Sequence, residues 1–148
     1  MSYPTRLVLD TNTVMALWFF RDPGLTALHT ALDSPRYVPC CREDALEELR
    51  RVLGYSQFAI AATEQTRILG SYRERVKLIA ASDPAAETPL LPLCRDRDDQ
   101  KFLEITRDAT ADYLLTRDKA LLRLARHRLV RDRFQILTPE RFVSDRLA

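Results

Sequence analysis

LVLDTNTV, residues 7–14, runs from apolar side chains into an aspartate and then into a group of polar side chains. The apolar part predicts a buried strand over residues 6–10 that ends on Asp10. A solvated turn explains such an ending, and so does a site that requires a negative charge at the end of a sheet strand. In an open α/β sheet, functional groups gather beyond the carboxyl ends of the strands. The position of Asp10 therefore raises the question of which other acids reach the same edge.

Strands and helices alternate along the rest of the chain. Further strands are expected at residues 36–40, 90–93, 112–116 and 134–137. Helices are expected at residues 13–20, 25–32, 42–53, 63–81, 98–108 and 119–127, and a last helix begins with Thr138 as its N-cap and Pro139 as its first residue. This alternation predicts βαβ units and a parallel sheet, and hence the α/β class.

The composition is that of one globular domain spanning residues 1–148, with 46% hydrophobic residues. Three cysteines, two of them adjacent, do not form a disulfide framework and fit a reducing compartment. The chain lacks the run of about 18 apolar residues that predicts a transmembrane helix. Its first residues lack the charged and apolar segments of a secretory leader. We therefore expect a cytoplasmic protein.

Acids follow three of the predicted strands. Asp10 ends the first strand, Asp118 follows the strand at 112–116, and Asp96, Asp98 and Asp99 follow the strand at 90–93. Because parallel strands end at the same edge of a sheet, these acids are expected to meet there. Periodicity does not separate Asp98 from Asp99, since both flank the apolar face of their helix. Each acid taken alone has a simpler role as a helix N-cap or turn residue.

The helix expected at residues 42–53 offers a fourth source of acid. Its apolar side chains share one face, and Glu47 lies nearly opposite that face. Glu48 lies at the boundary of the face, where a side chain reaches a site beside the core. The pattern therefore favours Glu48, although an ordinary surface ion pair with Arg51 is also compatible with its position.

Four converging acids without basic partners repel one another, and their pKa values rise unless a cation neutralises them. Oxygen ligands favour Mg²⁺ or Mn²⁺, whereas two histidines and no Cys-x-x-Cys pair make a structural zinc site a poor fit. Such an ion activates water for phosphodiester cleavage and stabilises the attacking and leaving oxygens. Asn12 and Thr116 are candidates to orient the carboxylates or the metal-bound waters.

Basic residues near Asp118 are candidates for contacts with a nucleic acid backbone. Arg117, Lys119 and Arg123 are the nearest of them in sequence, and arginine suits bidentate contacts with phosphate. A solvated surface accounts equally well for this charge. The three isolated glycines exclude a phosphate-binding glycine loop.

Taken in order, these motifs resemble a PIN domain, and in particular the PIN domains that act as toxin components of toxin–antitoxin pairs. The resemblance covers nearly the whole chain and is carried by LVLDTNTV, CREDALEELRRVL, CRDRDDQKFLEIT, ADYLLTRDKALL and FQILTPERFV. It assigns the four family acids to Asp10, Glu48, Asp99 and Asp118, with Asp96 and Asp98 as accessory acids and Thr116 before the last aspartate. Arg117 stands where the family commonly has a glycine.

The resemblance implies a three-layer α/β/α sandwich around a mainly parallel sheet of about five strands. It also implies a metal-dependent endoribonuclease that uses Mg²⁺ or Mn²⁺ and in which water attacks the phosphorus. RNA is then the substrate, a homodimer is the expected assembly, and a cognate antitoxin protein is the expected inhibitor. No membrane partner is expected.

Two other functions are compatible with parts of the sequence. A haloacid-dehalogenase-like phosphatase also has an aspartate at the end of its first strand, but it requires a second acid two residues later, where this chain has Asn12. A non-catalytic RNA- or protein-binding module would keep the fold and bind phosphates through the basic residues at 119–133. Such a module would require neither Asp10 nor a metal ion.

Overall fold

A computed structural model describes residues 3–147, which fold around a five-stranded sheet. The strands are β1 (Thr5–Leu9), β2 (Tyr37–Cys41), β3 (Lys77–Leu78), β4 (Tyr113–Leu115) and β5 (Gln135–Leu137). They lie in the order β3-β2-β1-β4-β5, and every neighbouring pair is parallel. The predicted α/β fold with a mainly parallel sheet is confirmed, and the sheet is parallel throughout.

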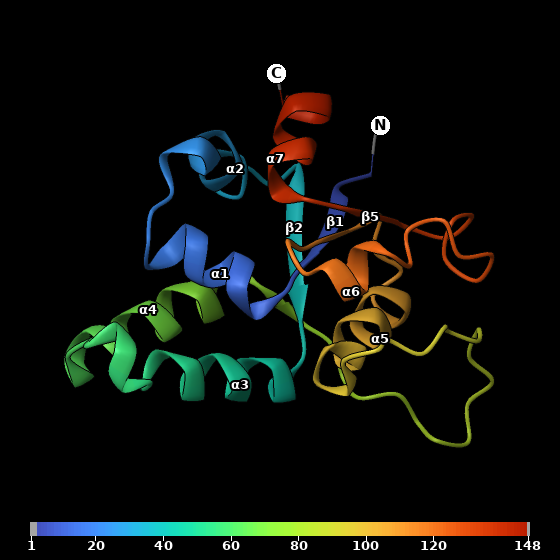
Figure 1. The fold of residues 1–148 in the computed structure, drawn as a ribbon, viewed down its shortest axis with the longest axis horizontal. Coiled ribbons are helices and arrows are strands. Elements are labelled where there is room, and N and C mark those ends of the chain that lie inside the picture. The colour runs from blue at the N-terminus through green and yellow to red at the C-terminus, as the bar shows by residue number, and fades with distance from the viewer. Residues whose placement is uncertain (1–2, 148) are drawn as a thin grey trace.

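Helices cover both faces of the sheet and complete the predicted three layers. The α-helices are α1 (Thr11–Trp18), α2 (Thr26–Ala31), α3 (Glu43–Leu53), α4 (Ala62–Arg75), α5 (Gln100–Asp108), α6 (Lys119–Leu122) and α7 (Pro139–Phe142). Short helical turns lie at η1 (Pro23–Leu25), η2 (Ser56–Phe58), η3 (Arg97–Asp99) and η4 (Val143–Leu147). Figure 1 shows α1 and α2 on one side of the strands and α5 and α6 on the other.

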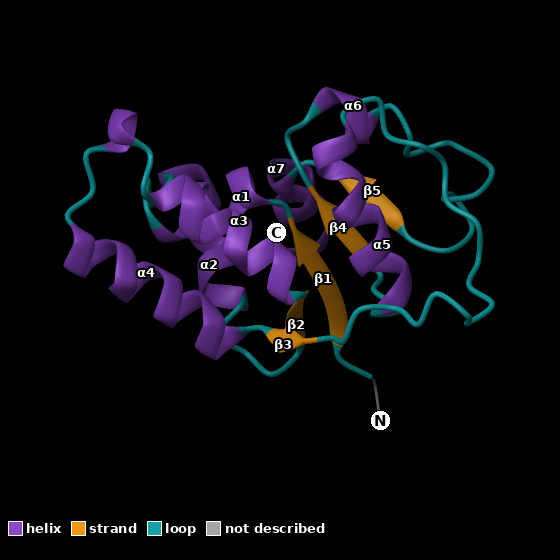
Figure 2. Ribbon diagram, turned by 90° about the horizontal axis from the view of Figure 1, so that it is seen from below, coloured by secondary structure: helices purple, strands orange, loops and turns teal. Residues whose placement is uncertain are grey.

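β1 occupies the middle of the sheet, where both of its faces are covered. Leu7, Val8 and Leu9 are at most 3% exposed, and a strand buried on both faces has the continuous apolar sequence seen before Asp10. Figure 2 shows β1 and β4 side by side, with the chain leading from their carboxyl ends into α1 and α6. Because α1 and α6 lie on opposite sides of the sheet, the carboxyl ends of β1 and β4 are its topological switch point, where open α/β sheets place their sites. The region at these two strand ends is called the β1–β4 crevice below.

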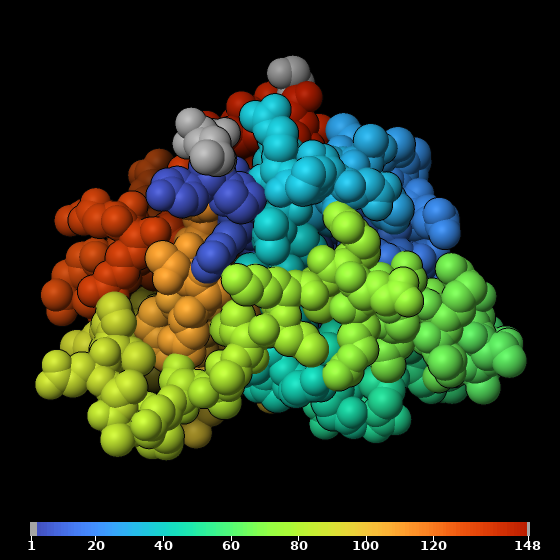
Figure 3. Space-filling view, turned by 180° about the vertical axis from the view of Figure 1, so that it is seen from behind, coloured from blue at the N-terminus to red at the C-terminus, as the bar shows by residue number. Residues whose placement is uncertain are grey.

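The prediction of a strand at residues 90–93 is wrong. Leu90 and Leu93 are 74% and 86% exposed, and the segment lies in a loop on the surface. Figure 3 shows this part of the chain running over the outside of the molecule before it reaches α5. The third strand is instead β3, inside the range 63–81 for which the sequence predicts a helix. Its two residues pair with Cys40 and Cys41, and such distant pairing leaves no local signal in the sequence.

The length predicted for the helix at residues 119–127 is also wrong. α6 ends at Leu122, and the chain from residue 123 to residue 133 continues in turns. Backbone N–H groups of Leu124, Ala125 and His127 donate to carbonyl groups three residues earlier, which is the tighter pattern of successive turns.

The predicted start of the last helix is confirmed, since the Thr138 hydroxyl accepts from the Arg141 N–H and Pro139 is the first residue of α7.

Substituting alanine for Leu114 is expected to lower the free energy of unfolding by about 3 kcal/mol. Leu114 is fully buried in β4, so alanine would leave a cavity in the middle of the sheet. The matched control is Leu93→Ala in the exposed loop, where we expect a change of no more than about 0.5 kcal/mol. Urea unfolding of the two variants measures the difference, and equal losses would contradict the placement of these residues.

Candidate active site

Asp10 is fixed at the carboxyl end of β1 by the start of α1. Its side chain is 4% exposed and caps α1, with Oδ1 accepting from the Thr13 N–H at 2.9 Å. The other oxygen accepts from the Thr116 hydroxyl at the end of β4. Burial raises the pKa of the Asp10 carboxyl above its usual value, and the hydrogen bonds from Thr116 and Thr13 oppose part of that shift. Asp10 is therefore both an N-cap and a rigidly held carboxylate in the crevice.

Thr116 joins Asp10 to the second acid of the crevice. Its fully buried hydroxyl donates to Asp10 and also accepts from the Asp118 N–H at 2.9 Å. Asp118 caps α6, because its Oδ2 accepts from the Leu121 N–H at 3.0 Å. Both strand-end aspartates thus begin a helix, and a single threonine hydroxyl fixes their spacing.

The structure separates Asp99 from Asp98. Asp99 is half-buried at the junction of η3 and α5, whereas Asp98 is exposed and Asp96 caps η3. Burial raises the pKa of Asp99 to about 7, and the next contribution is the negative charge of Asp118. Asp96, Asp10 and Glu48 add further repulsion. Asp99 therefore faces the acids of the crevice from the loop between β3 and α5, and not from the end of a strand.

Glu48 approaches the same crevice from α3. The predicted boundary position is confirmed, because its side chain is 18% exposed while Glu47 pairs with Arg50 on the surface. The partner of Glu48 is Lys101, at 2.8 Å between Nζ and Oε1, rather than Arg51. The Thr11 hydroxyl donates to the other carboxylate oxygen. The sequence did not predict Lys101 and Thr11 as partners of Glu48. They are 53 and 37 residues away from it, and no local sequence pattern marks such a distant contact.

The donor chemistry of this acidic centre fits a hard divalent cation. Asp10, Glu48, Asp99 and Asp118 supply only oxygen ligands. Burial, together with the negative charge of the neighbouring acids, raises the pKa of Asp99. Within residues 3–147, no three side chains of His, Cys, Asp or Glu are close enough together to enclose a metal ion as they stand.

The candidate RNA-binding and supporting residues have different surroundings. Arg117 pairs with Asp22 at 2.8 Å and with Glu140 at 2.7 Å, so its guanidinium holds η1 and α7 beside the β4–α6 turn. Lys119, Arg123 and Asn12 are exposed. In the described part of the chain, Lys119 and Arg123 take part in no ion pair. The two cations remain accessible to a phosphate backbone, whereas Arg117 would first have to leave its two acids.

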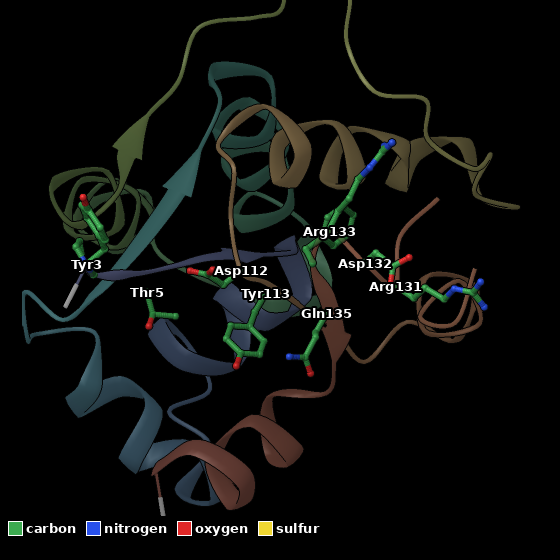
Figure 4. A pocket seen from close by; sticks show the side chains of 10 residues that line it. Tyr3, Thr5, Asp112, Tyr113, Arg131, Asp132, Arg133 and Gln135 are labelled. Carbon is green, nitrogen blue, oxygen red and sulfur yellow. The ribbon is translucent and has the colours of Figure 1, made fainter. Parts of the chain in front are cut away.

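A hollow of about 450 Å³ lies at the opposite edge of the sheet. It is lined by the first residues of three strands, Thr5, Tyr113 and Gln135, together with Asp112 and the 131–134 turn. Figure 4 shows Arg131 and Arg133 extending away from Tyr113 and Gln135. Asp112 accepts from the Arg6 N–H and thereby continues the sheet. This hollow therefore lies at the amino ends of the strands, away from the acidic centre.

The parallel sheet and the acids at the β1–β4 crevice define a nuclease-like α/β domain with a carboxylate centre. The sequence pattern described as "PIN domain" matches residues 6–120. This chain belongs to the PIN-domain family. PIN domains are generally nucleases, most often ribonucleases, and they usually act with divalent metal ions. A search of curated proteins finds no match.

The match to the family covers β1 through the start of α6, and so includes all four principal acids. The class of macromolecule that PIN domains bind is nucleic acid. No helix in the described residues is both long enough and apolar enough to cross a membrane.

Proposed function

We propose that this protein is a metal-dependent endoribonuclease whose centre consists of Asp10, Glu48, Asp99 and Asp118. The observation that carries the proposal is the contact of the Thr116 hydroxyl with both the buried Asp10 carboxylate and the Asp118 backbone N–H at the ends of β1 and β4, in a chain that belongs to the PIN-domain family. The raised pKa of Asp99 supports it, because perturbed carboxyl groups are typical of functional sites. Mg²⁺ or Mn²⁺ is the cation that this oxygen-only donor set favours.

The roles of the chain's own groups follow from their contacts. The hydrogen bonds from Thr13 and Thr116 hold the Asp10 carboxylate in one orientation, and Thr116 fixes Asp118 through its backbone N–H. Asp99 adds a half-buried carboxyl group at the junction of η3 and α5. When bound, the ion would lower the pKa of an attacking water and stabilise the charge that develops on the phosphate. The exposed residues Asn12, Asp96 and Asp98 are proposed as supporting residues.

RNA is proposed to reach the centre along the surface formed by α6. Lys119 directly follows Asp118 and Arg123 follows the last residue of α6, and both are exposed, so they can contact phosphates that flank the cleaved bond. Arg117 is the third candidate, and its contact would compete with Asp22 and Glu140. Contacts of this kind position the backbone but carry no sequence information.

Cleavage of a mixed pool of labelled RNA by the purified protein tests the proposal. We expect products with Mn²⁺ and with Mg²⁺, and loss of all products when EDTA removes the metal, because the acids alone do not activate water. Internal cleavage would appear as fragments from a circular RNA, which an exonuclease leaves intact. Cleavage that continues unchanged in EDTA would contradict the metal-dependent mechanism.

Substituting valine for Thr116 is expected to lower kcat/KM for RNA by about 10- to 100-fold, as found for residues that orient metal ligands. Valine keeps the shape but removes the donor to Asp10 and the acceptor for the Asp118 N–H. Loss of the buried hydrogen bonds should also lower the free energy of unfolding by about 1–2 kcal/mol. Thr116→Ser keeps the hydroxyl and should retain most activity; equal losses in both variants would argue against the hydroxyl's role.

We also propose that the protein acts in the cytoplasm as the toxin of a toxin–antitoxin pair and forms a homodimer. These points rest on the resemblance to toxin members of the PIN-domain family. Expression in a bacterial host should arrest growth, and co-expression of the protein encoded by the adjacent gene should relieve the arrest. Sedimentation equilibrium of the purified chain measures its oligomeric state. Normal growth during expression of the active protein would contradict the toxin role.

A further inference from the structure

Lys101 places an ammonium group against Glu48, one of the four acids of the proposed centre. Its Nζ pairs with Glu48 Oε1 at 2.8 Å and donates to the Asp98 carbonyl oxygen at 2.8 Å. The same nitrogen lies 5.5 Å from the centroid of the Phe102 ring. The side chains of Lys101 and Glu48 are each 18% exposed. Three contacts therefore fix this cation, and its ion pair is shielded from water.

The contacts of Glu48 leave little room for a second cation. One of its oxygens pairs with Lys101 and the other accepts from the Thr11 hydroxyl. The nearby Arg42 is committed elsewhere, since it pairs with Asp44 at 2.7 Å and with Glu104 at 3.0 Å. A divalent ion bound to Glu48 would lie beside the Lys101 ammonium, and repulsion between like charges is strong where solvent is partly excluded.

We propose that Lys101 is a positioning residue that neutralises Glu48 in the metal-free protein and competes with the divalent ion for that carboxylate. This inference rests on the proposed metal-dependent function. The chain's own cation holds α3 and α5 together across the crevice until a divalent ion replaces it. Lys101 thus stabilises the metal-free fold and weakens metal binding at the same time.

The test is a calorimetric titration of the EDTA-treated and dialysed full chain with MnCl₂, without RNA. Lys101→Met is expected to bind Mn²⁺ about tenfold more tightly, because it removes the competing charge. Its metal-free Tm is expected to fall by about 4 °C, because Glu48 then lacks its cation. Lys101→Arg keeps the charge and should bind Mn²⁺ like the wild type. The control is Lys77→Met on exposed β3, which removes the same charge elsewhere.

A second pair of variants tests whether Lys101 acts through Glu48. In a Glu48→Gln background, Lys101→Met should change the Mn²⁺ affinity less than twofold, because the contested carboxylate is gone. A persistent tenfold gain in that background would overturn the route through Glu48. If Lys101→Met does not fold, Lys101→Gln removes the charge and keeps a hydrogen-bond donor.

The possible failures are distinguishable. If the wild type binds Mn²⁺ but Lys101→Met binds it with equal or lower affinity, the competition is overturned while the proposed nuclease function stands. The same conclusion follows if Lys77→Met increases the Mn²⁺ affinity as much as Lys101→Met does. If the wild type binds no Mn²⁺, the proposed metal centre fails, and the inference that depends on it fails with it.

Discussion

Substituting asparagine for Asp10 is expected to lower RNA cleavage about a thousandfold while the fold remains intact. Loss of a carboxylate that supports charge stabilisation by a metal ion costs several kcal/mol in the transition state, and each 1.36 kcal/mol is a factor of ten in rate. The fold should survive because asparagine is also a good N-cap, so its Oδ1 can still accept from the Thr13 N–H. Single-turnover cleavage with Mn²⁺ measures the loss, and circular dichroism checks the fold.

The control for this experiment is Asp132→Asn, which makes the same change at the opposite edge of the sheet. We expect its activity to stay within twofold of the wild type. If Asp10→Asn cleaved RNA as fast as the Asp132 variant, the centre at the β1–β4 crevice would not be catalytic. RNA binding that survived in a chain without cleavage would then favour the binding-module alternative.

The second large effect is expected at Asp99, where removal of the charge should stabilise the metal-free protein. The pKa of Asp99 is higher in the folded chain than in the unfolded chain, so its ionisation destabilises the fold at pH values above the unfolded pKa. The loss of stability is complete once the pH exceeds the folded pKa of about 7. At pH 8, Asp99→Asn is therefore expected to raise the free energy of unfolding by about 2 kcal/mol, a value discounted from the full shift because Asp99 is only half-buried. The gain should shrink as the pH falls from 8 to 5.

With Mn²⁺ bound, the wild type should be more stable than Asp99→Asn, which is the reverse of the order expected without metal. A bound cation stabilises the folded wild type by an amount that rises with the logarithm of its affinity, and it compensates the charge of Asp99. Asp99→Asn lacks that ligand and therefore gains less. Urea unfolding in EDTA and in Mn²⁺ measures both effects. The matched variant is Asp98→Asn, whose exposed side chain predicts a change below about 0.5 kcal/mol in EDTA. Equal gains at positions 98 and 99 would contradict the assignment of Asp99 to the crevice.

Local signals in the sequence were sufficient for the middle of the sheet and for the helix starts next to it. The apolar run before Asp10 is buried on both faces in β1, and Asp10, Asp118 and Thr138 each cap the helix that follows them. Caps and continuous apolar runs depend on neighbours within a few residues, so the sequence shows them directly. The position of Glu48 at the edge of its helix face was predictable for the same reason.

Local patterns failed where a partner far away in the chain decides the structure. β3 forms because the backbone of Lys77 and Leu78 pairs with that of Cys40 and Cys41 in β2. The more apolar segment at 90–93 remains in an exposed loop. Apolar character alone does not make a strand, because a strand also requires a neighbour with free backbone groups. Asp99 consequently reaches the crevice from the segment between β3 and α5, although the sequence predicts a strand end before it.

By itself, the sequence determined that a parallel α/β sheet forms and that acids follow β1 and β4, since alternation and capping are local properties. Only the tertiary structure decided that Asp99 and not Asp98 faces the crevice, because burial depends on how α5 packs on the sheet. Only the tertiary structure placed the Thr116 hydroxyl on Asp10 and the Lys101 ammonium on Glu48. These contacts join residues on different elements, so they form and stabilise the structure only when the elements have packed together.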